Sequence, residues 1–392
     1  MQLAGGVGRL GTESAFEVLA RAKALEQAGR SIINLGIGQP DFQTAPHIVE
    51  AACKALRDGH HGYTPANGIL PLREAVAADI HKRLGLTVDP DHVLIVPGGK
   101  VTMFFAILMF GEPGAEIVYP DPGFPIYASA INFTGATAVP LPLLEKNGFA
   151  FTAEDVLERI TPRTRLIILN SPANPTGGVT PKAEADKLAA GLEKHPGVAV
   201  LSDEIYGQML YDGREHVSLL RYEHLRDRLI LLDGWSKTYA MTGWRLGYSV
   251  WPASLIEAAT RLCINCHSCV NAAAQYAGIA ALQGPQDAVA RMMAAFDERR
   301  RYVVKALNEL PGVSCIEPAG AFYAFPNIGR TGFKSKALEV KLLEEVGVAT
   351  IAGTSFGRYG EGYLRISYAN SLENIRAAME RMGEWLRKAA AA

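Results

Sequence analysis

The sequence predicts an α/β fold: a mostly parallel sheet of seven strands flanked by helices, followed by a smaller α+β unit. Short apolar runs alternate with longer helical patterns up to about residue 290, and this alternation is typical of strand–helix–strand connections. The apolar runs carry few charges, as expected of strands buried on both faces. Beyond residue 290 the pattern changes to one long charged helix and shorter strand candidates.

The seven strand candidates are His92–Pro97, Ala115–Tyr119, Thr137–Leu141, Arg165–Leu169, Val198–Leu201, Leu229–Leu232 and Arg245–Val250. Helical patterns between them cover Ala153–Ile160 and Lys182–Lys194. The later unit begins with a charged helix over Gln286–Leu310. Its strand candidates are Val313–Ala324, Val348–Ile351 and Tyr363–Tyr368. We therefore expect a domain boundary near residue 290.

Composition excludes several classes of protein. A net charge of −1 argues against a broad nucleic-acid surface. The sequence has no apolar run long enough to span a bilayer, and its first residues lack the apolar segment of a secretion signal. Five cysteines are an odd count that does not suggest a disulfide framework, which fits a reducing cytoplasm.

Three of these cysteines form a tandem C-x-x-C pattern at Cys263, Cys266 and Cys269. Such spacing resembles part of a zinc or iron–sulfur site. A fourth ligand is not adjacent, because Cys315 lies far along the chain and Cys53 is remote. We therefore expect no metal site and interpret these cysteines as small packing residues.

Four polar segments follow strand candidates. They are Pro97–Lys100, Asn170–Gly177, Ser202–Tyr206 and Asp233–Lys237. Ligands of open parallel sheets bind at the carboxyl ends of the strands. We therefore expect the four segments to converge on one ligand.

The chemistry of these segments indicates which ligand. Backbone amides at a helix start favour a phosphate, and a hydroxyl and a guanidinium add to that preference; here they come from Gly99, Lys100, Ser236 and Arg245. A carboxylate, a phenol, an amide and an amine are offered by Asp203, Tyr206, Asn174 and Lys237. A phosphate, a ring nitrogen, a phenolic oxygen and an aldehyde would satisfy them all, and together these groups describe pyridoxal 5′-phosphate (PLP).

Several motifs then resemble the class I aminotransferases of PLP fold type I, in particular the prokaryotic aspartate aminotransferase subgroup. They are Gly-Ile-Gly-Gln-Pro-Asp-Phe at 36–42, Tyr-Thr-Pro-Ala-Asn-Gly at 63–68, Asn-Pro-Thr-Gly at 174–177, Ser-Asp-Glu-Ile-Tyr at 202–206, Ser-Lys-Thr-Tyr-Ala-Met-Thr-Gly-Trp-Arg-Leu-Gly at 236–247 and Leu-Arg-Ile-Ser-Tyr-Ala at 364–369. The resemblance implies a large PLP-binding domain at 46–290 and a small domain made of 1–45 and 291–392. One departure is Gly234, where many relatives have a serine that contacts the phosphate.

The resemblance also implies roles for single residues. Lys237 would carry the cofactor and shuttle protons, with Asp203 on the ring nitrogen and Tyr206 on the ring oxygen as the other catalytic residues. Cofactor contacts would come from Gly99, Lys100, Phe124, Asn174, Asp203, Tyr206, Ser236, Lys237, Arg245 and, from a neighbouring subunit, Tyr63. Substrate contacts would come from Gly38, Asn174, Lys100 and Arg365. The position of Tyr63 implies a homodimer with shared active sites.

The implied reaction moves an amino group between an L-amino acid and a 2-oxo acid such as 2-oxoglutarate, in two half-reactions through pyridoxamine phosphate. Lys100 matches a lysine that contacts the distal carboxylate of acidic substrates, which favours aspartate or glutamate. The other interpretation of Lys100 is a helix-start residue beside the phosphate. Aromatic or aliphatic amino acids and a PLP-dependent lyase remain alternatives. An aminotransferase-like transcription regulator is disfavoured, since no room for a DNA-binding module precedes Gly36 and no basic patch replaces it.

Overall fold

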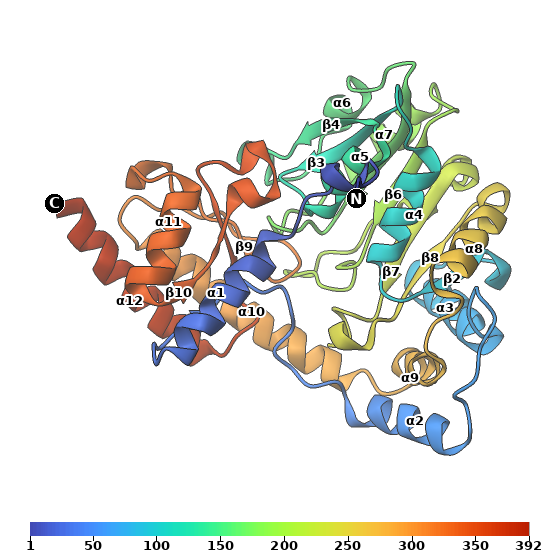
Figure 1. The fold of residues 1–392 in the computed structure, drawn as a ribbon, viewed down its shortest axis with the longest axis horizontal. Helices are drawn as coiled ribbons and strands as arrows, with labels where there is room; N and C mark the ends of the chain where they lie inside the picture. The colour runs from blue at the N-terminus through green and yellow to red at the C-terminus, as the bar shows by residue number, and fades with distance from the viewer. Residues whose placement is uncertain (392) are drawn as a thin grey trace.

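The computed structural model describes residues 1–391, and Figure 1 shows a larger part built on one sheet beside a smaller part that holds the C-terminus. The sheet has seven strands in the order β2-β8-β7-β6-β5-β3-β4. Their bounds are β2 Val93–Val96, β3 Glu116–Asp121, β4 Thr137–Pro142, β5 Thr164–Asn170, β6 Ala199–Asp203, β7 Leu229–Gly234 and β8 Gly247–Val250. The predicted α/β class and its mostly parallel sheet are confirmed.

Helices cover both faces of the sheet (Figure 1). One face packs against α4 Lys100–Phe110, α5 Ile126–Thr134 and α8 Ala253–His267. The other face packs against α2 Pro46–Arg57, α3 Leu70–Leu84, α6 Ala153–Leu157, α7 Lys182–Leu192 and α9 Ala272–Gln283. Because side chains of a strand alternate between faces, both sets of strand residues must be apolar.

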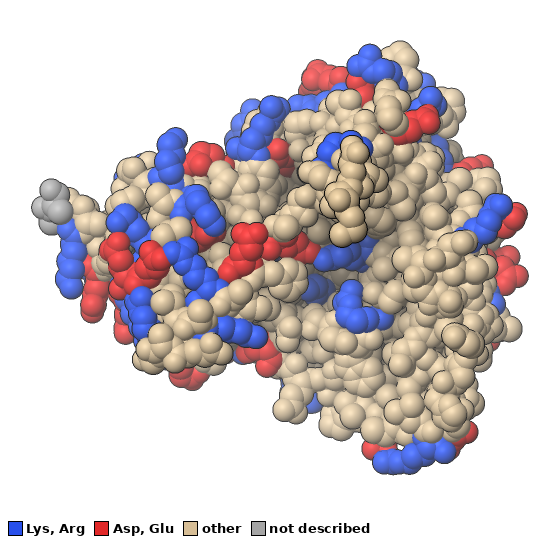
Figure 2. Space-filling model, viewed as in Figure 1, with Lys and Arg blue, Asp and Glu red and all other residues tan. Residues whose placement is uncertain are grey.

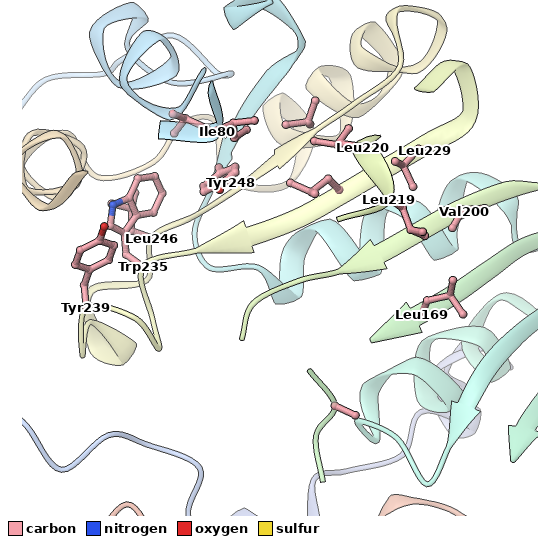
Figure 3. Close-up of a cluster of buried hydrophobic side chains, with 14 of the residues drawn as sticks. Ile80, Leu169, Val200, Leu219, Leu220, Leu229, Trp235, Tyr239, Leu246 and Tyr248 are labelled. Carbon is pink, nitrogen blue, oxygen red and sulfur yellow. The ribbon is translucent and has the colours of Figure 1, made fainter. Parts of the chain in front are cut away.

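Strand β7 shows how this pattern fills two cores. Leu229 and Leu231 point to the face with α3, whereas Ile230 and Leu232 point to the face with α4. Figure 3 shows Leu229 in the first of these clusters, close to Leu219 and Leu220 from the segment before β7. The sheet is therefore held rigidly from both sides, and its carboxyl edge can position functional groups.

Strand direction determines which loops share an edge. Strands β3 to β7 run parallel to their neighbours, whereas β8 runs antiparallel to both β7 and β2. Because β8 is antiparallel to both β2 and β7, these two strands run in the same direction. The loop after β2, the loops after β5 and β6, and the connection that enters β8 therefore all lie at one edge of the sheet.

The smaller part contains short strands and longer helices. Its helices are α10 Asp287–Asn308, α11 Ser335–Lys341 and α12 Leu372–Ala391, joined by the N-terminal helix α1 Ser14–Gln27. Its strands form an antiparallel set of β11 Ile351–Ala352, β12 Leu364–Ser367 and β9 Tyr323–Ala324, and a parallel pair of β1 Ile33–Asn34 and β10 Val348–Ala349. The predicted boundary at residue 290 falls in the first turn of α10.

Three strand predictions need correction. Only the last two residues of the predicted strand Val313–Ala324 are extended, because Pro318 and Gly320 interrupt it and Ala321 has a φ of 58°. The predicted strand Val348–Ile351 is split between two sheets. Arg245 lies just outside β8, with a φ of 53° that belongs to the preceding turn.

The N-terminal segment crosses from the larger to the smaller part, as Figure 1 shows. Arg9 donates hydrogen bonds to the carbonyls of Asn132 (2.7 Å) and Phe133 (2.9 Å) near the end of α5. The amide of Gly11 donates to Ser129 Oγ (2.9 Å). Helix α1 then packs on β10 and β11. Within residues 1–391, we find no helix with the length and apolarity needed to cross a membrane.

Candidate functional site

A cavity of about 470 Å³ opens at the carboxyl edge of the sheet, between the two parts of the molecule. Small-molecule sites typically have volumes of roughly 300–1,000 Å³. Figure 2 shows Lys and Arg side chains gathered in a hollow near the middle of this face. The predicted site residues that line the cavity are Gly38, Gly99, Lys100, Phe124, Asn174, Asp203, Tyr206, Ser236, Lys237, Arg245 and Arg365. The four polar segments predicted to converge therefore contribute to one cavity.

Lys237 lies in the connection between β7 and β8. Its amine donates a hydrogen bond to the carbonyl of Gly38 (2.6 Å) and lies near the rings of Tyr206 and Phe322. Burial, together with the nearby cations Arg365 and Arg245, lowers the pKa of Lys237 to about 8. A larger fraction of this amine is therefore unprotonated near neutral pH, as a nucleophile or a base requires.

Asp203 is the last residue of β6 and is fully enclosed. One carboxylate oxygen accepts a hydrogen bond from the Tyr127 hydroxyl (2.5 Å), and the other accepts from the amide of Ile205 (3.2 Å). Burial raises the pKa of Asp203 to about 6, although the Tyr127 hydrogen bond opposes this shift. A carboxylate in such a place is stabilised by a cationic partner, such as a protonated ring nitrogen.

Arg365, on β12, contributes a buried cation to the lining of the cavity. Its guanidinium donates to Asn174 Oδ1 (3.0 Å) and to the carbonyl of Gly36, and it lies 4.8 Å from the ring centroid of Tyr323. Its Nε is buried without a hydrogen-bond partner among residues 1–391. A desolvated guanidinium with a free donor is suited to binding a carboxylate.

The loop after β2 and the start of α4 form a concave backbone surface. Gly98 has a φ of 90°, and a Cβ there would lie 2.0 Å from Arg245 Nη2, so only glycine allows the arginine this close. Arg245 donates to the carbonyl of Thr242 (2.9 Å). Because α4 begins at Lys100, the start of the helix favours an anion, although the amides of Val101 and Met103 already donate to the carbonyls of Gly98 (3.1 Å) and Gly99 (3.3 Å).

Phe124 and Lys100 line the cavity on the α4–α5 side. The Lys100 ammonium lies 5.4 Å from the ring centroid of Phe124. It also forms an ion pair with Glu13 from the N-terminal segment. Glu13 is a lining residue that was not predicted from the sequence.

One predicted site residue, Tyr63, lies outside this cavity, and the unusual Gly234 has a structural explanation. Tyr63 is 94% exposed and is not among the residues that line this cavity. Its neighbour Thr64 accepts a hydrogen bond from the buried amide of Gln275 (2.9 Å), which fixes the start of this loop. A Cβ at Gly234 would lie 2.8 Å from the Cα of Gly247, so packing between β7 and β8 explains the glycine.

The three clustered cysteines lie at and just beyond the end of α8. Cys263 is buried, Cys266 is exposed and Cys269 is partly buried. Within the described chain, no three or more His, Cys, Asp or Glu side chains are grouped as a metal site would require. The cavity described above is therefore the place where the functional groups of this chain come together.

Sequence reasoning also missed two tyrosines. Tyr127 contacts Asp203, and the Tyr323 hydroxyl lies 2.7 Å from that of Tyr206. Tyr127 lies one helical turn after Phe124, and that spacing was an available signal. Tyr323 gave no local signal, because its contact with Tyr206 spans 117 residues.

The cavity has the donor and acceptor set that PLP requires. A concave backbone surface with Arg245 suits its phosphate, buried Asp203 suits its ring nitrogen, and the amine of Lys237 suits its aldehyde. The unpartnered Nε of Arg365 leaves a donor for a substrate carboxylate. The residues present therefore fit the cofactor on chemical grounds.

Comparisons with known proteins agree with this chemistry. The family described as "Aminotransferase class I and II" matches residues 30–382. The chain is 36% identical to an aspartate aminotransferase of Geobacillus stearothermophilus, over 98% of this chain and 99% of that protein. It is 38% identical to aromatic-amino-acid aminotransferase 2 of Thermococcus litoralis, over 93% and 94%.

A solved structure shows the same fold. The aspartate aminotransferase of Rhizobium meliloti superposes with a TM-score of 0.94 at 33% identity, covering 99% of each chain. The family match spans most of the chain, and the fold is therefore PLP fold type I. The chain belongs to the class I and II aminotransferases and is a PLP-dependent transaminase.

Proposed function

We propose that this aminotransferase transfers the amino group of aspartate or glutamate to a 2-oxo acid such as 2-oxoglutarate. The observation that carries the proposal is the presence of Arg365 and Lys100 in one cavity with Lys237. A dicarboxylic amino acid needs one cation for each carboxylate. The relatives named aspartate aminotransferases support this choice, whereas the Thermococcus relative is named for aromatic amino acids.

The reaction requires a proton to leave the α-carbon of the amino acid. When bound, PLP supplies an electron-withdrawing ring that stabilises the negative charge left on that carbon. Lys237 Nζ takes the α-proton and, in the second half-reaction, delivers a proton to the α-carbon of the new amino acid. Its lowered pKa suits both directions, because the amine exchanges protons near neutral pH.

The other residues bind and orient. Asp203 holds the ring nitrogen in its protonated state, and Tyr127 keeps that carboxylate in place. Asn174 and Tyr206 would hold the ring oxygen of PLP, and Phe124 would pack on its ring. Gly99, Lys100, Ser236 and Arg245 would hold the phosphate through backbone amides, a hydroxyl and a guanidinium.

Arg365 orients the substrate through its α-carboxylate, with Gly38 and Asn174 beside it. Before substrate binds, the guanidinium is held by Asn174 and Gly36 and lies over the rings of Tyr323 and Phe356. These contacts hold a desolvated cation in a fixed orientation, which favours a bidentate carboxylate contact.

The substrate assignment predicts a selective effect of Lys100→Ala. The variant should lower kcat/KM for aspartate and glutamate by about one to two decades, the loss expected for one charge-assisted hydrogen bond. Alanine and phenylalanine should be affected much less. Initial rates with 2-oxoglutarate over a panel of amino acids measure this pattern.

Arg365→Lys is the matched comparison, because every amino acid has an α-carboxylate. It should raise KM for all substrates, since an ammonium cannot reproduce two parallel hydrogen bonds. If Lys100→Ala instead depresses all substrates equally, the lysine serves the cofactor and the preference for acidic substrates loses its support.

We further propose a homodimer in which Tyr63 of one subunit reaches the phosphate in the other. Its nearly complete exposure supports this arrangement, as does the exposure of the apolar residues Leu56, Leu70 and Ile264. The division into a large domain at 46–290 and a small domain of 1–45 with 291–392 is likewise a proposal. The cytoplasmic location remains a prediction from the sequence.

Shared sites predict complementation between two defective proteins. Lys237→Ala lacks the amine, and Tyr63→Ala should lose about tenfold in activity through one missing phosphate contact. In a hybrid dimer, the site with the intact lysine receives the intact tyrosine from its partner. Equimolar subunit exchange should therefore restore about a quarter of the wild-type sites in a two-fold dimer. Verified exchange without recovery would contradict sharing.

A further inference from the structure

Glu13 and Lys100 form an ion pair across the substrate side of the cavity. Glu13 Oε1 contacts Lys100 Nζ, and the Glu13 side chain is only 14% exposed. The chain on either side of Glu13 is anchored: Gly11 is bonded to Ser129 on α5, and α1 begins at Ser14 and packs on the smaller part. The carboxylate is therefore held in the cavity by the fold, unlike a mobile surface charge.

The Glu13–Lys100 ion pair has no assigned role in binding the cofactor. The cavity is lined by four cationic side chains, Lys100, Lys237, Arg245 and Arg365, and two carboxylates, Glu13 and Asp203. In the proposed function, Arg245 faces the phosphate, Lys237 the aldehyde, Asp203 the ring nitrogen and Arg365 the α-carboxylate. Lys100 and Glu13 are the charges that remain for the substrate side chain.

The negative charge of Glu13 also acts at the reacting centre. Burial lowers the pKa values of Lys237 and Arg365, and the carboxylate of Glu13 opposes the lowering at both groups. A second carboxylate placed here by a substrate would therefore meet Glu13 at short range, where like charges repel.

We propose that Glu13 is a specificity-determining residue, which holds the position on Lys100 that the distal carboxylate of an acidic substrate would take. The inference rests on the proposed role of Lys100. A dicarboxylic substrate must displace Glu13 from the lysine, whereas a neutral amino acid leaves the pair intact. Glu13 therefore lowers the preference for acidic over neutral substrates below what Lys100 alone would produce.

Glu13→Gln tests this directly, because it removes the charge and keeps the shape. Glu17→Gln is the matched control: it makes the same change one turn along α1, at an exposed residue that accepts a hydrogen bond from Thr12 outside the cavity. In the PLP-loaded enzyme, Glu13→Gln should raise the ratio of kcat/KM for aspartate to that for alanine by about two- to fivefold, the upper part of the range for one partly exposed ion pair.

Binding of unreactive acids gives a second readout. Calorimetry should show succinate binding about two- to fivefold more tightly to Glu13→Gln than to the wild type, for the same ion-pair reason. Butyrate, which has the same carbon count and one carboxylate, should change much less. In a Lys100→Ala background, the effect of Glu13→Gln on the succinate-to-butyrate ratio should shrink to the part that comes from direct repulsion between the two carboxylates.

The outcomes separate this inference from the proposed function. If Glu13→Gln leaves the aspartate-to-alanine ratio or succinate binding unchanged, or lowers either, the specificity role is overturned. If Lys100→Ala then still affects acidic substrates selectively, the proposed function stands. If Lys100→Ala shows no such selectivity, the proposal of an acidic substrate is wrong, whatever the result with Glu13→Gln.

Discussion

Lys237→Ala is expected to reduce transamination by about four decades or more, the upper end of what acid–base catalysis supplies. The other lysine that lines the cavity, Lys100, is partly exposed and paired with Glu13, so it is not placed to replace Lys237. The variant removes both the amine that attaches the cofactor and the base at the α-carbon. Steady-state rates and circular dichroism would show an inactive but folded protein.

Covalent attachment gives an independent readout of the same residue. Borohydride reduction should add the mass of the cofactor to the wild-type chain but not to Lys237→Ala. Lys182→Ala, which removes an exposed lysine at the start of α7, is the control and should behave as the wild type does. Substantial turnover by Lys237→Ala with natural PLP would refute the assignment.

Asp203→Asn is expected to slow transamination by roughly 10²–10³-fold while PLP still binds, a typical loss for one preorganised electrostatic partner. The amide cannot stabilise a protonated ring nitrogen, so the ring withdraws electrons poorly. Single-turnover rates with aspartate measure the effect on the chemical step. A loss of tenfold or less, about 1.4 kcal/mol, would show that Asp203 is not the ring partner.

Tyr127→Phe separates the charge of Asp203 from its positioning. The variant removes the 2.5 Å hydrogen bond to the carboxylate and leaves the negative charge. It should therefore cost less than Asp203→Asn, roughly tenfold, at the lower end of the range for one hydrogen bond to a charged group. Equal losses in the two variants would mean that the hydrogen bond, and not the charge, accounts for the effect of Asp203→Asn.

The fold was largely predictable because strand periodicity and helix patterns are local properties. The seven strands of the main sheet were all found, as their apolar runs are continuous and bounded by turns. The smaller part was harder, since its strands have only two to four residues. Strands this short form only where a partner strand lies beside them. The sequence alone therefore did not show that one predicted strand divides into β10 and β11, which belong to different sheets.

The cavity was predictable where chemistry is concentrated in short motifs. Lys237, Ser236 and Arg245 share one segment, and Asp203 and Tyr206 share another. The missed groups reach the site through tertiary packing. Glu13 contacts Lys100 across 87 residues, and nothing around Glu13 in the sequence marks it as different from the other acidic residues of α1.

The reversed strand β8 has a consequence for how this enzyme tolerates insertions. Residues 235–246 leave one strand and return to its neighbour, and hydrogen bonds such as Met241 N to Ser236 O and Trp235 N to Leu246 O fix the connection internally. Lys237 and Arg245 therefore keep a constant spacing. Added residues here would misplace both, whereas the exposed turn at Pro196–Gly197 can lengthen without moving either. Among related sequences, we therefore expect insertions and deletions at exposed turns of this kind and not in the connection formed by residues 235–246.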